Sequence, residues 1–117
     1  FTYIDDIVTG VVKVLDKPPA GDPKWSGKDP EPSRSHAPYR LYNIGNNSPV
    51  ELMAFIEAIE KALGKKAKKN FLAMQPGDVP ATWADVSDLV QDFGYKPAMS
   101  VEQGVKNFVE WYVSYYK

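Results

Sequence analysis

The sequence contains no cysteine, which excludes disulfide bonds, thiolate metal sites and a cysteine nucleophile. Its one histidine, His36, has no metal-ligand partner at a recognised spacing, so we expect it to be exposed and structural. No apolar run approaches the ~20 residues that span a bilayer, and the N-terminus is not a basic stretch followed by an apolar one. We therefore expect a cytoplasmic protein with no membrane partner, since a chain without cysteine suits a reducing compartment.

A strong net charge is also missing, because 14 lysines and arginines face 15 aspartates and glutamates. Without a general basic field we expect no nucleic-acid partner. Five lysines do cluster near one predicted helix end: Lys61, Lys65, Lys66, Lys68 and Lys69. No aromatic residues alternate with them to stack on bases, so the cluster is interpreted as a solvated face beside a helix C-terminus, where cations are favourable.

The standard catalytic motifs are absent. There is no Gly-x-Ser-x-Gly, no Walker-type loop and no His-Glu-x-x-His, and none of the 8 glycines has the spacing of a dinucleotide-binding fingerprint. The paired acids Asp5 and Asp6, like Asp85 and Asp88, stand at predicted helix starts, where capping is the usual role. We therefore expect this chain to hold no cofactor, no metal and no catalytic residue.

Helical patterns are what the sequence does have. Apolar residues at helical spacing predict four helices, which begin near Asp5, Ser48, Ser87 and Ser100. A capping box from Ser48 to Glu51 would start the second helix, and Gly64 would end it. A chain of 117 residues has room for one domain and typically buries roughly 65% of its unfolded surface, enough for one modest core.

Short apolar runs at 41–44, 71–72 and 82–84 predict a few short strands. The fold class expected is therefore α/β, with about four helices, over residues 1–117 as a single domain. Residues 16–38 carry six of the 10 prolines, which predicts an exposed loop. That loop could be a surface insertion or a flap over a substrate.

One turn combines stiffness with polar side chains. Pro76 bends the backbone and Pro80 stiffens its exit, so Gln75 and Asp78 are presented from a constrained loop. An amide can donate to a phosphate or pyrimidine oxygen, and a carboxylate can accept from ribose hydroxyls. The alternative is that Asp78 closes an Asx-type turn and Gln75 is solvated. The residues alone favour neither.

Four stretches carry a family resemblance, and in order they read FTYIDDIVTGVVKVLDKPP, YNIGNNSPVELMAFIEAIEKALGKKAKKN, MQPGDVPATWADVSDLVQDFGYKP and SVEQGVKNFVEWY. Together they resemble the C-terminal third of bacterial nucleotide-sugar epimerases of the extended short-chain dehydrogenase/reductase family, above all UDP-glucuronate 4-epimerases. The resemblance implies an isomerase that inverts C4 of UDP-glucuronate to UDP-galacturonate, through transient oxidation with NAD held by an N-terminal Rossmann domain.

The resemblance also implies that residues 1–117 are a substrate-binding fragment. The Rossmann domain and the catalytic Tyr-x-x-x-Lys pair would lie outside it, so the fragment alone should bind no NAD and be inactive. Asp78 would lie beside the nucleoside and Gln75 near the diphosphate, with Thr82 lining the same exit and Trp83 packing. The family often has arginine where Gln75 stands, and glutamine gives only a neutral, weaker bond.

Alternatives stay open at this point. A sibling UDP-sugar decarboxylase or dehydratase is the near one, although such enzymes tend to carry arginine at the position of Gln75. A stand-alone interaction module is the alternative from another class. Neither Arg34 nor Arg40 falls on a phosphate-binding position of the family. Because half of the substrate pocket would be missing, we expect only weak UDP-sugar binding. Helices made to dock on missing neighbours would expose an apolar face, so we also expect a homo-oligomer.

Overall fold

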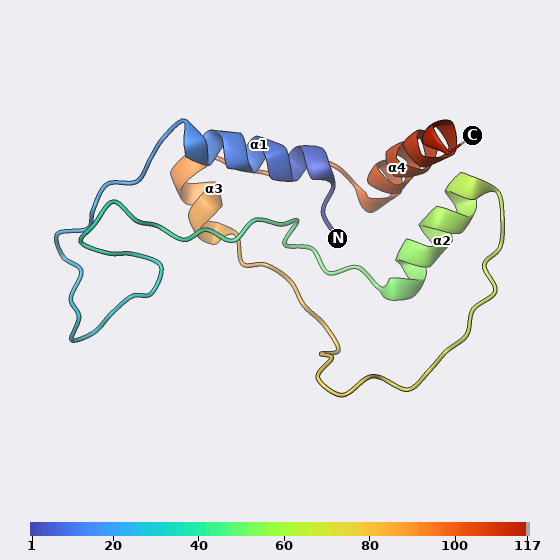
Figure 1. Ribbon diagram of the computed structural model, residues 1–117, viewed down its shortest axis with the longest axis horizontal. Helices are drawn as coiled ribbons and strands as arrows, with labels where there is room; N and C mark the ends of the chain where they lie inside the picture. The colour runs from blue at the N-terminus through green and yellow to red at the C-terminus, as the bar shows by residue number, and fades with distance from the viewer. Residues whose placement is uncertain (117) are drawn as a thin grey trace.

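Two pairs of helices lie on different sides of the molecule, joined by long segments (Figure 1). The structure is a computed structural model that describes residues 1–116. Helix α1 (Ile4–Leu15) packs beside α3 (Ser87–Phe93), and α2 (Leu52–Leu63) packs beside α4 (Val101–Tyr115). The four predicted helices are thus confirmed. None of them, over residues 1–116, has both the length and the hydropathy to cross a bilayer.

Helix α2 begins later than its sequence pattern predicts. The predicted capping box is wrong, because Glu51 is extended at ψ 136° and α2 starts only at Leu52, while Ser48 stays exposed. The backbone before α2 is held away from the helix, since the amide of Asn46 donates to Oγ1 of Thr2 at 3.1 Å. The predicted end of α2 is confirmed, because Gly64 follows the helix with φ 65°.

The acids at helix starts take different roles. The carboxylate of Asp6 accepts from the amides of Ala98 and Met99 at 3.2 and 3.1 Å, so it ties α1 to the segment before α4 instead of capping its own helix. Asp85 accepts from the amide and the hydroxyl of Ser87 at 2.9 and 2.6 Å. It therefore satisfies one of the free N–H groups at the start of α3, as capping predicts.

The predicted strands do not form. Over residues 1–116 the only bridges are isolated ones, Ser26 with Asp29 and Arg34 with Arg40. The segments 41–44, 71–72 and 82–84 make no ladder, although the amide of Leu41 donates to the carbonyl of Ser33 at 2.9 Å, and a strand is defined by the ladder it makes with a partner. The regular structure of this chain is therefore helical, and the predicted α/β class is not seen within it.

The chain buries little of itself. Within residues 1–116 its buried apolar side chains are Val86, Leu89, Tyr95, Val105 and Val109, of which Leu89 and Tyr95 are fully buried. The radius of gyration is 18.8 Å, against about 13 Å for a compact domain of this length. The accessible surface is 9376 Å², against about 6,400 Å² for a compact monomer of this mass. Within residues 1–116, no helix of one pair packs against a helix of the other.

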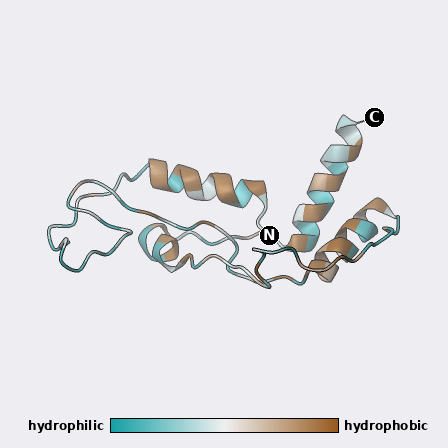
Figure 2. Ribbon diagram, turned by 60° about the horizontal axis from the view of Figure 1, so that its bottom comes forward, coloured by the Kyte–Doolittle hydropathy of each residue, from teal (hydrophilic) through white to brown (hydrophobic). Residues whose placement is uncertain are grey.

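Apolar side chains remain exposed on two helices. Figure 2 shows hydrophobic residues along α1, and the exposed ones there are Ile4, Val8, Val11, Val12 and Leu15. Those on the second half of α4 are Phe108, Trp111, Tyr112, Val113 and Tyr115, and Tyr116 follows directly after the helix. Their exposed fractions run from 46% to 76%. The predicted apolar face is confirmed, and its extent suits contact with another polypeptide.

A buried carboxylate closes the loop after α2. The side chain of Glu60 is 3% exposed, and it accepts from Nζ of Lys66 at 2.7 Å, from Nζ of Lys69 and from the amide of Ala67 at 3.0 Å. These bonds, led by the one from Lys66, lower the pKa of Glu60 from 4.5 to about 2. The prediction of a solvated lysine face holds for Lys66, whose side chain is 85% exposed, and is wrong for Lys69, whose side chain is 26% exposed.

We expect Glu60 to make the stability of α2 depend on pH. Its pKa is lowered on folding, so its contribution is fully present above about pH 4.5 and is lost as the pH falls through about 2. The stability difference between the wild type and Glu60→Gln should shrink over that range. Thermal unfolding followed by circular dichroism measures it, with Glu57→Gln on the same helix as control. If the stability difference between the wild type and Glu60→Gln did not change with pH, the stabilising role of the hydrogen bonds to Glu60 would be contradicted.

We also expect the chain to self-associate through its apolar faces, because water contact with them is unfavourable. Sedimentation velocity should show species heavier than the 13.1 kDa monomer, in amounts that rise with concentration. Val11→Glu should reduce association, whereas Thr9→Glu, also exposed on α1, should not. A monomer that persists at high concentration would contradict this expectation.

Candidate functional site

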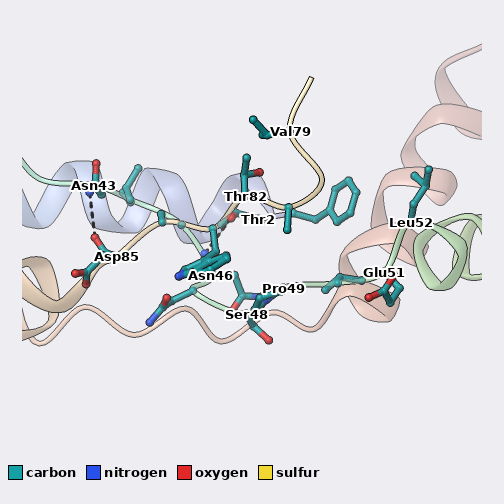
Figure 3. Close-up of a pocket in the computed structure, with 18 of the residues that line it drawn as sticks. Thr2, Asn43, Asn46, Ser48, Pro49, Glu51, Leu52, Val79, Thr82 and Asp85 are labelled. Carbon is teal, nitrogen blue, oxygen red and sulfur yellow. Dashed lines mark hydrogen bonds between the residues drawn. The ribbon is translucent and has the colours of Figure 1, made fainter. Parts of the chain in front are cut away.

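A pocket of about 730 Å³ lies between two segments that are far apart in the sequence. Its sides are residues 43–52, the N-side wall, and residues 79–85, the C-side wall, with Phe1 and Thr2 between them. Figure 3 shows Asn43 and Asp85 joined at one end of the pocket and Leu52 at the other. Amide and hydroxyl groups therefore line a cleft whose walls are not helical.

The two walls are fastened to each other and to the N-terminus. Nδ2 of Asn43 donates to the carbonyl oxygen of Asp85 at 3.2 Å, and Oγ1 of Thr2 accepts from the amide of Asn46. The hydroxyl and then the amide of Ser87 lower the pKa of Asp85. The Asp85 carboxylate is therefore ionised at neutral pH, and its hydrogen bonds to Ser87 fix the end of the C-side wall.

An arginine anchors the N-side wall to α3. The side chain of Arg40 is 8% exposed, its Nη2 lies 2.6 Å from Oδ2 of Asp88, and its guanidinium stands 5.4 Å from the ring centre of Tyr42. The hydroxyl of Tyr42 donates to Oδ2 of Asp92 at 2.8 Å. Burial and then this bond raise the pKa of Tyr42. Arg40 is thus engaged by the carboxylates of its own chain.

The structure separates the predicted site residues. Thr82 is exposed and lines the pocket on the C-side wall. Gln75 and Asp78 lie on the turn just before that wall, outside the pocket lining, where the amide of Asp78 donates to the carbonyl of Gln75 at 3.1 Å. Both are exposed, and over residues 1–116 neither side chain has a hydrogen-bond partner. A backbone bond closes the turn, so the Asx-type alternative is not what the structure shows.

Three other residues that line the pocket had been predicted from the sequence to have different roles. Trp83, expected to pack, is 65% exposed on the C-side wall, so that expectation is wrong. Asn43 and Asn46 were interpreted only as part of a short strand and its turn, yet both line the pocket with Thr2. The one local signal was the run of amide side chains in NIGNN, whose partners lie more than 40 residues away.

The proline-rich loop takes no part in this pocket. None of residues 16–38 lines it, which favours the surface insertion over the flap. His36 is exposed, as predicted, and its ring stands edge-on to Trp25 at 5.1 Å. Within residues 1–116 no group of three or more histidine, aspartate or glutamate side chains is arranged to hold a metal ion.

No protein-family model matches the chain, but individual proteins do. Protein CapI of Staphylococcus aureus is 55% identical over 117 residues, which are 100% of this chain and 35% of that protein. The probable UDP-glucuronate 4-epimerase of Rhizobium meliloti is 46% identical over 118 residues, with the same two coverages, 100% and 35%. UDP-glucuronate 4-epimerase 1 of Arabidopsis thaliana is 48% identical over 99% of this chain and 26% of its own length.

Solved structures agree with these relatives. UDP-glucuronic acid 4-epimerase from Bacillus cereus in complex with UDP-glucuronic acid and NAD matches 96% of this chain and 32% of its own, with a TM-score of 0.67 and 30% identity. A mutant of that enzyme, in complex with UDP-4-deoxy-4-fluoro-glucuronic acid and NAD, gives a TM-score of 0.72 over 99% of this chain and 32% of its own. The chain is homologous to the C-terminal part of UDP-glucuronate 4-epimerases.

The chain spans about a third of the length of the epimerases and other curated relatives it matches. An α/β parent fits this homology, although the epimerase-related chain is itself mostly helical. A dinucleotide pyrophosphate is usually held where a strand turns into a helix. Residues 1–116 contain no such strand, so they do not fit NAD on their own.

Proposed function

We propose that the chain is the UDP-sugar-binding part of a cytoplasmic UDP-glucuronate 4-epimerase, and that an NAD-binding domain and the catalytic groups lie on polypeptide outside residues 1–117. The observation that carries this is the match of 96% of the chain to an epimerase solved with UDP-glucuronic acid and NAD. The chain covers only 26% to 35% of its curated relatives, which favours a part of a longer enzyme over a stand-alone interaction module. This chain alone would be inactive.

The chemistry of the exposed turn suits the nucleotide end of the substrate. The carboxylate of Asp78 can accept from ribose hydroxyls, and the amide of Gln75 can donate to a diphosphate oxygen. Neither side chain has a protein partner over residues 1–116 that a ligand would have to displace. Thr82 would add a hydroxyl from the pocket wall. A neutral amide binds phosphate with roughly half the strength of a charge-assisted fork, so the grip would be weak.

The dimensions of the pocket are compatible with such a ligand. Its volume of about 730 Å³ lies within the range of roughly 300–1,000 Å³ common for small-molecule sites. The side chain of Asn46 supplies a polar group along its walls. The sugar would extend from the nucleotide end toward the NAD-binding polypeptide, where inversion at C4 would give UDP-galacturonate.

We expect UDP to bind this chain with a Kd no tighter than about millimolar, because part of the site lies elsewhere. A millimolar Kd corresponds to a binding free energy of only ~4 kcal/mol. Amide resonances of the Gln75–Asp78 turn and of Thr82 should shift in a titration followed by two-dimensional NMR. UDP-glucuronate should shift the same resonances, whereas free glucuronate should not.

Asp78→Asn should weaken this response, because it removes the acceptor charge and keeps the shape. Asp29→Asn, the same change in the exposed 16–38 loop, should leave the response intact. A titration in which UDP shifts none of these resonances would refute the proposed function. A micromolar Kd would contradict the view that the site is shared with other polypeptide.

A further inference from the structure

The two walls of the pocket meet at Asn43 with Asp85 and at Gly45 with Ala84, and just outside the walls Arg40 pairs with Asp88 on α3. The two segments run antiparallel through these three contacts. No β-ladder joins the two segments over residues 1–116. Side chains and one close backbone approach therefore take the place of the hydrogen bonds that would fix a strand in register.

The middle contact fixes the direction of the C-side wall. Nδ2 of Asn43 donates to the main-chain oxygen of Asp85, so it holds the backbone itself and not a mobile side chain. The Asp85 carboxylate is occupied by Ser87 at the start of α3. The backbone of Asp85 is thus held by Asn43 on one side and by α3 on the other.

The third contact sets the distance between the walls. Gly45 is buried, and a Cβ at this position would lie 3.1 Å from Cβ of Ala84 and 3.7 Å from Oγ1 of Thr2. Contacts of 3.0–3.4 Å require the neighbour to move by a few tenths of an ångström. Any residue with a side chain at Gly45 would therefore push Ala84, and the wall it belongs to, outward.

We propose that Asn43 and Gly45 are positioning residues for the nucleotide end of the substrate. They hold the wall that carries Thr82 and that follows directly from the Gln75–Asp78 turn. Thr82 is two residues from Ala84, about 7 Å along an extended chain, so a shift at the contact is passed to the binding wall. This role rests on the proposed function, because it assumes that the pocket receives UDP.

The test compares UDP titrations of the full chain carrying Asn43→Asp, Gly45→Ala or Asn70→Asp. Asp cannot donate to the Asp85 carbonyl, so Asn43→Asp should weaken UDP binding about fivefold, the worth of one typical hydrogen bond. Gly45→Ala adds no polar group and should also weaken binding. Asn70→Asp makes the same charge change at an exposed site away from the pocket and should match the wild type.

A melting curve and the resonances of α2 and α4 are recorded for each variant, since a purely structural role would change these and leave the Kd of the folded chain unchanged. Weaker UDP binding with unchanged α2 and α4 resonances supports the positioning role. Wild-type affinity in Asn43→Asp and in Gly45→Ala would overturn it and leave the proposed function standing. Absence of any UDP response in the wild type would overturn both.

Discussion

The two helix pairs of this chain do not share a core, so apolar surface on α1 and α4 has to be covered by something else. A surface of 9376 Å² exceeds that of a compact monomer by about 3,000 Å², which is the scale of an obligate interface between partners. The chain is homologous to about a third of the length of longer proteins, and contact with the remainder of such a protein would explain the exposed surface.

The pocket follows from the same constraint. Its two walls come from segments that find no ladder partner within the described residues, so they are held by side chains: Arg40 to Asp88, Asn43 to Asp85. Such walls can present amides and hydroxyls toward a ligand without first using them in a sheet. The turn from Gln75 to Asp78 is stiff for a local reason, its prolines and a backbone bond, and needs no support from the core.

Local signals could be predicted from the sequence, and long-range ones could not. The helices followed from apolar spacing, and the Gln75–Asp78 turn from its prolines and glycine, because both depend on neighbours within a few residues. The prediction of strands failed because a strand forms only beside a hydrogen-bonded partner strand, which residues 1–116 do not supply. Asn43 was missed because its role arises only when a wall 42 residues away comes back to it. Glu60 was missed although Lys66 is only 6 residues away, because the loop after the helix has to fold back before the two side chains meet.

The central claim is that this chain completes a UDP-sugar site whose NAD-binding part lies on other polypeptide. The most direct test replaces the matching part of the Bacillus cereus epimerase with residues 1–117 and assays conversion of UDP-glucuronate. We expect the chimera to form an isomer of unchanged mass that differs at C4, and to do so less well when Asp78 is changed to Asn. A folded chimera that binds NAD yet leaves UDP-glucuronate unconverted, while the parent enzyme converts it, would contradict the account.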